Sequence, residues 1–173
     1  MADTLNNLPS VTFPRAGFRR RFGGWFYDFL LAIAVYMVAG AASFGIFYSL
    51  IQFGIINMAG YQHDIDVLLN NAGYKYINEV WKLSWVVFFF VYFWAKSGQT
   101  LGMRAWRLRV QNQDGSLISI KTGLKRILPT LLGLGNLMVL VDRKNKLSLQ
   151  DRLTKTEVVC ISLESNKGKN WVN

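Results

Sequence analysis

The sequence predicts an α-helical membrane protein with two transmembrane helices, a third short re-entrant or interfacial hydrophobic helix and a small cytoplasmic β element. Three observations support this fold class. The composition is 51% hydrophobic and only 17% charged, whereas a soluble domain carries about 25% charged residues. A 34-residue stretch from Phe29 to Gln62 contains no charge. Finally, 18 of the 20 basic residues lie before the first predicted span or after the second.

The first predicted span covers about residues 25–53. A bilayer core is crossed by about 20 apolar residues in a helix, so this run has length to spare. Arg19–Arg21 and the small residues Ala39-Gly40-Ala41 together resemble a cleavable signal peptide. Because the apolar run continues to Ile56 without a polar segment after the small residues, an uncleaved span is the better interpretation.

Two further hydrophobic runs follow. The second predicted span covers about residues 77–95, and it needs Lys82 to extend its side chain towards the interface. The third run covers about residues 124–141 and has an apolar centre of 15 residues, Ile127–Val141, which is short for a span. Pro129 lies inside it. We therefore expect this segment to re-enter the membrane or to lie at the interface.

The distribution of basic residues predicts the orientation. Only Lys75, in the predicted outer loop, and Lys82, near the outer end of the second span, lie towards the outside, and the others lie before the first span or after the second. Because basic residues stay on the cytoplasmic side, both termini are expected in the cytoplasm. The basic segments next to the spans are expected to contact anionic lipids rather than nucleic acid.

The remaining segments divide the chain into a flexible tail at 1–14, a membrane domain at 15–163 and a polar tail at 164–173. In the outer loop, residues 64–70 are expected to form a short helix. Alternating polar and apolar residues at 107–111 predict a strand, and residues 117–120 and 156–163 predict two more. These strands are expected to pair as a small antiparallel sheet at the membrane surface.

Three sequence blocks together suggest a family. They read AGFRRRFGGWFYD at 16–28, GQTLGMRAWRLRV at 98–110 and LSLQDRLTKTEVV at 147–159. With these blocks the chain resembles the RDD family of small bacterial membrane proteins, named for one arginine and two aspartates. The resemblance covers roughly residues 15–160 and assigns the three positions to Arg21, Asp28 and Asp151. Gln150 stands where the family often has histidine, which weakens any proton-transfer role there.

The resemblance implies a multi-pass integral protein of the bacterial inner membrane. Transport of an undefined solute is the usual suggestion for the family, and cation/proton antiport has been proposed for some members.

Asp28 is the strongest candidate site residue. Placing a carboxylate within a spanning helix costs free energy, so such a residue is usually functional or paired. One interpretation is that Asp28 binds a proton or Na⁺, and the other is that it forms a structural ion pair. Asp151 is expected either to cap a helix or to serve as the counter-charge of Arg21. We expect Arg21, Asp28 and Asp151 to form one charge network at the cytoplasmic boundary.

Small residues mark expected helix contacts and turns. The pairs Ala39/Ser43 and Ala41/Gly45 have the small-xxx-small spacing of close helix packing. Gly98 and Gly102 are expected in a turn where the second span leaves the membrane. No nucleophile–base pair, metal-ligand spacing or cofactor motif is present in the sequence, so no catalytic, metal or cofactor site is expected.

Two functions of different class remain compatible with the sequence. The first is an oligomeric transporter of a small solute or cation, because two spans alone do not enclose a pathway. The second is a membrane scaffold or accessory protein in which the arginine and the aspartates are structural. A homo-oligomer is expected in the first case.

Overall fold

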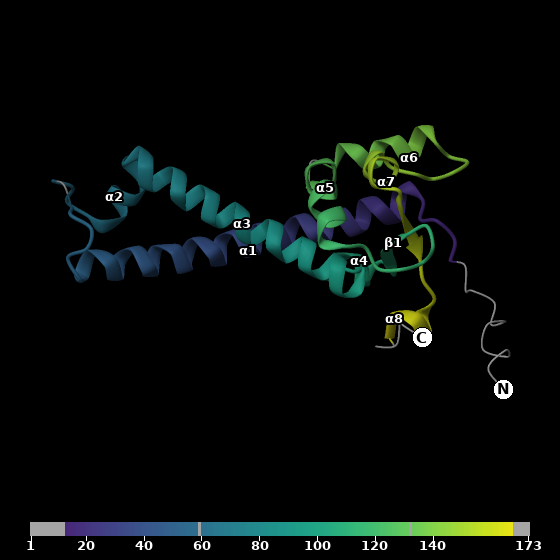
Figure 1. Ribbon diagram of the computed structural model, residues 1–173, viewed down its shortest axis with the longest axis horizontal. Helices are drawn as coiled ribbons and strands as arrows, with labels where there is room; N and C mark the ends of the chain where they lie inside the picture. Colours follow the sequence, from purple (N-terminus) through teal and green to yellow (C-terminus); the bar gives the residue numbers. More distant parts are fainter. Residues whose placement is uncertain (1–12, 59, 132, 168–173) are drawn as a thin grey trace.

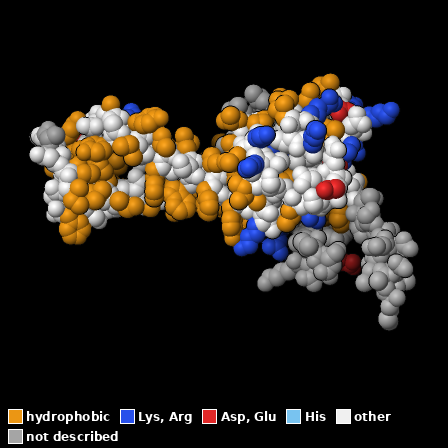
Figure 2. Space-filling model, in the orientation of Figure 1, with side chains coloured by type: hydrophobic (Ala, Val, Ile, Leu, Met, Phe, Trp, Pro, Cys, Tyr) orange, Lys and Arg blue, Asp and Glu red, His pale blue; other side chains and the backbone are white. Residues whose placement is uncertain are grey.

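The computed structural model describes residues 13–58, 60–131 and 133–167. It shows a long helical hairpin that projects from a smaller lobe of short helices and two strands (Figure 1). Side chains that cover the hairpin are mainly hydrophobic, whereas Lys and Arg side chains gather on the lobe (Figure 2). The fold therefore separates an apolar rod from a basic lobe.

The hairpin begins with α1, Phe18–Gln52, a helix of 35 residues and about 50 Å. Nothing interrupts it, because no proline occurs between Pro14 and Pro129. Many of its apolar side chains are exposed, such as Met37 at 67% and Val38 at 70%. Within the described ranges, α1 is the single helix that by itself is long and apolar enough to cross a membrane.

The second arm is α3, Ala72–Ser97, which follows the short tip helix α2, Asp64–Asn70, at the position expected from the sequence. Asn71 caps α3, since its side-chain oxygen accepts from the backbone N–H groups of Gly73 and Tyr74. The arms are joined by polar contacts. Ser43 donates to the side-chain oxygen of Asn78 over 2.6 Å, and the Trp81 indole donates to the Ala39 carbonyl over 3.1 Å.

The lobe is built around two strands. Gly98 ends α3 in the left-handed conformation (φ 69°), and α4, Leu101–Ala105, leads into β1, Leu108–Asn112. β1 pairs antiparallel with β2, Thr156–Cys160, in the register Leu108 to Cys160. Thus the expected pairing of a strand near 107–111 with one that begins at Thr156 is present.

The third hydrophobic run is not a straight helix. It consists of α5, Ile120–Leu131, a 3₁₀ turn η1, Leu134–Leu137, and α6, Met138–Val141. The pieces Ile120–Thr130 and Gly135–Val141 are bent by 87° relative to each other. They pass the length and hydropathy requirements of a span only when taken together. A proline within α5 and the left-handed backbone at Gly133 (φ 69°) account for the break.

The lobe ends with α7, Leu149–Thr154, before β2, and with α8, Leu163–Lys167, after it. The predicted strand at 117–120 is wrong: the Ser119 hydroxyl accepts from the Thr122 N–H, so the chain enters α5 instead. α8 also shows that the polar tail predicted at 164–173 begins as a helix. Residues 1–12 of the predicted N-terminal tail and 168–173 lie outside the described residues.

The two parts share a core. Apolar side chains of the lobe pack together with Val86, Phe90, Val91 and Trp94 of α3. The lobe is therefore fixed to the base of the hairpin by packing, and the residues predicted as functional lie at this junction.

Candidate functional site

The start of α1 is held by the edge of β2. Residues Pro14–Ala16 run beside this strand: the Cys160 N–H donates to the Pro14 carbonyl over 2.8 Å, and the Ala16 N–H donates to the Val158 carbonyl over 2.9 Å. Because α1 begins two residues later, its first turn lies over the lobe. This arrangement directs Arg21 into the lobe interior, where the residue is 3% exposed.

All five N–H groups of Arg21 find acceptors. One Nη donates to Asp151 over 2.6 Å and to the Ser148 hydroxyl over 3.2 Å. The remaining groups donate to three backbone carbonyls, those of Ala16, Lys146 and Val158. Arg21 therefore fastens the N-terminus of α1 to the C-terminal part of the chain.

Asp151 lies within a capping box at the start of α7. The Ser148 hydroxyl accepts from the Asp151 N–H, and the Asp151 carboxylate accepts from the Ser148 N–H over 3.1 Å. Each carboxylate oxygen also receives a guanidinium: Arg21 binds one, and Arg126 of α5 binds the other over 2.9 Å. Burial tends to raise the pKa of Asp151, but the charges of Arg126 and Arg21 outweigh it and hold the pKa below its usual value.

The cluster of Arg21, Arg126 and Asp151 carries two positive charges and one negative charge in the protein interior. Arg126 is 3% exposed and Asp151 is 1% exposed. The hydroxyls of Thr154 and Thr156 accept from one Nη of Arg126. Its Nε has no hydrogen-bond partner within the described residues.

Asp28 forms a separate set of contacts two turns further along α1. The Thr100 hydroxyl donates to one carboxylate oxygen over 2.6 Å, and the Gly102 N–H donates to the other over 3.1 Å. Thr100 is also the N-cap of α4, since its hydroxyl oxygen accepts from the Met103 N–H. Asp28 thus holds α4 against α1 without an ion pair among the described residues.

The structure therefore corrects the expected single network. It brings Arg21 and Asp151 together, adds Arg126, and places Asp28 in a different cluster. The physical reason is the geometry of α1, in which Asp28 and Arg21 are two turns apart. The Asp28 carboxylate therefore binds donors of α4, whereas the Asp151 carboxylate binds Arg21.

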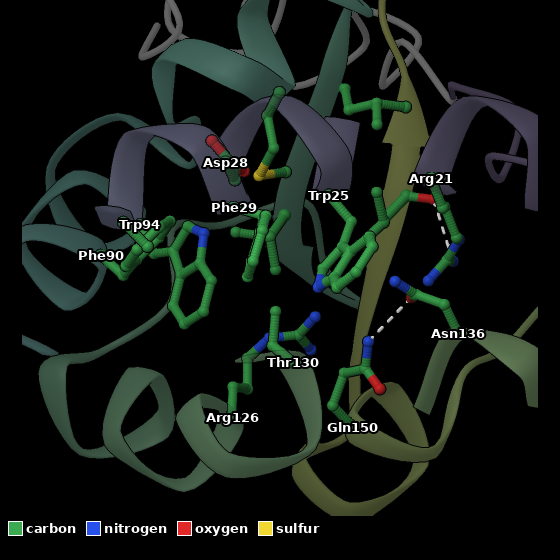
Figure 3. Close-up of a pocket in the computed structure, with 15 residues that line it drawn as sticks. Arg21, Trp25, Asp28, Phe29, Phe90, Trp94, Arg126, Thr130, Asn136 and Gln150 are labelled. Atoms are coloured by element: carbon green, nitrogen blue, oxygen red, sulfur yellow. Dashed lines mark hydrogen bonds between the residues drawn. The ribbon is translucent and has the colours of Figure 1, made fainter. Parts of the chain in front are cut away.

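A cavity of about 70 Å³ lies between the hairpin and the lobe. Figure 3 shows its residues: Trp25 and Phe29 of α1 and Phe90 and Trp94 of α3 lie on one side, and Arg126 and Thr130 of α5 lie opposite. The Thr130 hydroxyl, like the Nε of Arg126, has no hydrogen-bond partner in the described part of the chain. The cavity is thus apolar on one wall and polar on the other.

The expected helix-packing residues divide into two groups. Ala39 and Ser43 face α3 through the contacts already described, and Ala39 is 6% exposed. Ala41 and Gly45 are exposed, and a Cβ added at Gly45 would meet nothing within 4 Å. The first pair therefore packs within the chain, and the second pair lies on an open face of α1.

The two expected turn glycines have different roles. Gly98 provides the left-handed end of α3. Gly102 lies inside α4, where a Cβ would lie 2.8 Å from the Asp28 backbone nitrogen. A glycine is needed at this position because α1 and α4 approach so closely.

Sequence reasoning missed Arg126, Ser148 and Thr100 as partners of the charged residues. Ser148 carried a usable signal, because Ser-x-x-Asp is the pattern of a capping box. Arg126 carried none, since it was one of seven basic residues in a segment that the orientation argument treated together. In the described part of the chain no group of three or more His, Cys, Asp or Glu side chains gathers in a way that suits a metal ion.

Comparison with known proteins decides the family. The sequence matches the RDD family over residues 15–155, which is most of the chain. The chain belongs to the RDD family. This RDD match spans α1 through α7 and includes Arg21, Asp28, Arg126 and Asp151. No curated protein and no solved structure matches the sequence significantly.

RDD membership and the long apolar helix α1 together indicate a membrane protein. The described structure of this RDD chain is mostly helical.

Proposed function

We propose that this RDD chain is a multi-pass protein of the bacterial inner membrane whose lobe faces the cytoplasm. In this arrangement α1 and α3 cross as a hairpin, and the bent α5–α6 segment enters from the lobe side without crossing. The apolar surface of the hairpin and the basic lobe support the arrangement, because basic segments stay in the cytoplasm (Figure 2). The first and last described segments, residues 13–17 and α8, both lie in the lobe.

The charges within α3 are compatible with a span because they are partnered inside the hairpin. Lys82 and Glu79 form an ion pair over 2.7 Å. The Tyr36 hydroxyl of α1 donates to Glu79, and the Lys82 ammonium lies 4.5 Å from the centre of the Tyr36 ring. These contacts lower the cost of placing two ionised side chains in lipid.

We further propose that the protein is a subunit of a transporter for a small solute. The observation that carries this proposal is the cavity at the base of the hairpin, which contains buried polar atoms that have no hydrogen-bond partner among the described residues. Small-molecule sites are commonly pockets of mixed apolar and polar lining, and some lie between packed helices. A binding role is favoured over catalysis, because the described residues that line the cavity include no nucleophile beside a base.

A transport role requires more than one copy of the chain. Two helices enclose no pathway, so we propose a homo-oligomer in which the open α1 face at Ala41 and Gly45 provides one contact.

Anionic lipids are the other proposed partner. A groove on the lobe is lined by six basic residues and no described acidic one; the basic residues are Arg15, Arg19, Arg20, Arg107, Arg143 and Lys146. Such a groove beside the start of a membrane helix suits lipid phosphates. No nucleic acid is invoked.

Proteoliposomes test the transport proposal. Purified protein is reconstituted, and the movement of Na⁺, K⁺, protons and labelled neutral and anionic solutes is followed. We expect one solute class to move, and Ala32→Leu, which fills the cavity from α1, to stop this movement. Ala34→Leu is the matched control, because Ala34 is exposed on the same helix. If no tested solute moves with wild-type protein, the transport proposal fails.

Cation/proton antiport is tested in the same vesicles with Asp28→Asn. Proton movement that follows a cation gradient in the wild type and disappears in this variant would identify Asp28 as an ion-binding residue. Equal movement in both proteins would leave Asp28 with a structural role.

The second candidate is a non-transporting scaffold or accessory protein. One observation favours it: all carboxylate oxygens of Asp28 and Asp151 are already bonded within the chain. Neither aspartate then needs an external ion, and both hold the lobe on the hairpin. This candidate stands if the vesicles show no flux.

A further inference from the structure

One face of α5 presents two polar atoms to the cavity without a hydrogen-bond partner among the described residues. They are the Nε of Arg126 and the hydroxyl of Thr130, which lie one helical turn apart. Both face α1 across the cavity (Figure 3). Because both atoms carry a hydrogen to donate, the cavity between α5 and α1 suits a hydrogen-bond acceptor.

The charge of the neighbouring cluster specifies the acceptor further. Arg21 and Arg126 share the single carboxylate of Asp151, so the cluster keeps one positive charge in the interior. Asp28 also lines the cavity, and its carboxylate accepts from Thr100 and Gly102 rather than from Arg126. An anion on the Nε of Arg126 would therefore balance the charge of the Arg21–Asp151–Arg126 cluster where Asp28 makes no contact with it.

The opposite wall specifies the rest of the ligand. Trp25, Phe29, Phe90 and Trp94 form an apolar surface (Figure 3), and Ala32 of α1 also lines the cavity. Trp25 is held in position by Gly133, where an added Cβ would lie 2.8 Å from the indole ring. A group that fills this part of the cavity should therefore be apolar.

We propose that the cavity binds a small organic monocarboxylate, and this inference rests on the proposed function of the cavity as a solute site. The carboxylate accepts from the Nε–H of Arg126 and from the Thr130 hydroxyl, and the apolar body of the molecule packs on the aromatic wall. Gln150 does not oppose this arrangement, although its Oε1 also lacks a described partner, because this oxygen lies against Gly135.

Ordered water is the simplest alternative occupant. The cavity volume of about 70 Å³ exceeds the roughly 10–15 Å³ that one water needs. Water satisfies the two donors, but it neutralises no charge and gains nothing from the aromatic wall. A preference for an anion with an apolar body separates the two cases.

The test is binding to the purified full-length protein in lipid nanodiscs by titration calorimetry. Formate, acetate and propionate are the probes, because a cavity of about 70 Å³ is smaller than the roughly 150 Å³ that holds benzene, and each is compared with its neutral amide. We expect saturable binding of acetate or propionate that is about tenfold tighter than that of the matching amide. The formate signal should be the weakest of the three because formate lacks an apolar body.

Variants place the binding in the cavity. Thr130→Val removes the hydroxyl while keeping the side-chain shape, and should weaken carboxylate binding about tenfold. Thr122→Val, on the same helix but outside the cavity, should leave it unchanged. Ala32→Leu should abolish binding and Ala34→Leu should preserve it. These variants leave the Arg21–Asp151–Arg126 cluster intact, so that the folded state is retained.

Three results would overturn the inference: no saturable carboxylate binding, equal binding of acids and amides, or binding that survives Ala32→Leu. Its failure is distinct from failure of the transport proposal. Carboxylate binding without any flux would support the binding site and contradict the transport role. Cation flux without carboxylate binding would support the transport role and contradict the binding site.

Discussion

At the scale of single residues, one carboxylate organises three segments that are distant in the sequence. Asp151 receives Arg21 from α1 and Arg126 from α5 while it caps α7. A buried ion pair contributes little net stability compared with a well-packed apolar group, but removing one partner leaves the other charge uncompensated. Replacing Asp151 is therefore expected to destabilise the protein, even if the intact ion pairs contribute little net stability.

Asp151→Asn should lower the free energy of unfolding by about 3–5 kcal/mol at neutral pH. The pKa of Asp151 is lower in the folded protein than in the unfolded chain, so its contribution is complete above the unfolded value of about 4 and disappears as the pH falls through the folded value. Melting temperatures of detergent-solubilised protein between pH 7 and pH 3 measure this. The difference in melting temperature between the wild type and Asp151→Asn should become smaller below about pH 4.

The control for this comparison is Asp114→Asn. Asp114 also has a lowered pKa, caused by hydrogen bonds from Ser116, but it lies in an exposed turn. Its replacement should change the melting temperature little. If the melting-temperature difference between the wild type and Asp151→Asn stays constant down to pH 3, the ionised Asp151 carboxylate is not the source of the stability.

A double-mutant cycle should separate the two clusters. Arg21→Gln combined with Asp151→Asn should cost clearly less than the sum of the single changes, because the two side chains bind each other. Arg21→Gln combined with Asp28→Asn should be additive within about 0.5 kcal/mol, because Asp28 has its own partners. Thermal unfolding of the five variants measures both. Strong coupling of Arg21 to Asp28 would restore the single network expected from the sequence.

The charged residues show what a sequence can reveal at this scale. Arg21, Asp28 and Asp151 were identifiable because charges next to or within apolar runs are rare. Their partners were not identifiable, since whether a carboxylate meets a guanidinium or an N-cap depends on how the segments pack. A hydroxyl such as that of Thr100 looks the same in a turn and at a buried carboxylate.

At the scale of elements, the fold depends on a close crossing of α1 and α4. Asp28 reaches the N-terminal turn of α4 because Gly102 has no side chain there. The Thr100 hydroxyl caps the same turn and binds the same carboxylate. One glycine and one threonine thus fix the lobe at the base of the hairpin.

Gly102→Ala should destabilise the protein by about 1–3 kcal/mol, because the added Cβ would overlap Asp28 in a well-packed contact. Gly73→Ala is the matched control. Its added Cβ would come no closer than 3.4 Å to a neighbour, and alanine favours a helix more than glycine does. Differential scanning fluorimetry of the two variants checks this. Equal melting temperatures would mean that α4 shifts away from α1 at little cost.

Hydrophobic patterning predicted the elements unevenly. Residues 25–53 and 64–70 were predictable, because an uncharged run and a bounded acidic segment leave few alternatives. The helical continuation of α1 back to Phe18 was missed, since its first turn is basic and gains its stability from the lobe. The strand predicted at 117–120 failed because one serine cap decided between a strand and a helix start.

At the scale of the whole molecule, the apolar hairpin and the basic lobe predict the topology. With Cys160 replaced by serine, Gln62→Cys at the hairpin tip should react with an impermeant maleimide in intact spheroplasts. Ser165→Cys in α8 should react only after permeabilisation. Labelling of position 165 from the outside would show that the bent α5–α6 segment crosses the membrane.

The open face of α1 predicts the assembly. Gly45→Leu should reduce the mass of the detergent-solubilised particle towards that of a monomer, because a bulky side chain separates closely packed helices. Ser84→Leu, an exposed position on α3, is the matched control. Light scattering after size-exclusion chromatography measures the mass. An unchanged mass for Gly45→Leu would exclude this face, and a monomeric wild type would exclude the oligomer.

The pairing of Arg21 with Asp151 also imposes an order on biosynthesis. The two residues are 130 positions apart, and residues 14–16 lie beside a strand that begins at Thr156. At about 5–20 residues per second, Asp151 leaves the ribosome on the order of ten seconds after Arg21. In the proposed topology the guanidinium has no Asp151 to bind throughout that interval and stays at the hydrated cytoplasmic surface. The insertion machinery would then meet Arg21 as a free topogenic charge, which only the finished chain converts into a buried structural one.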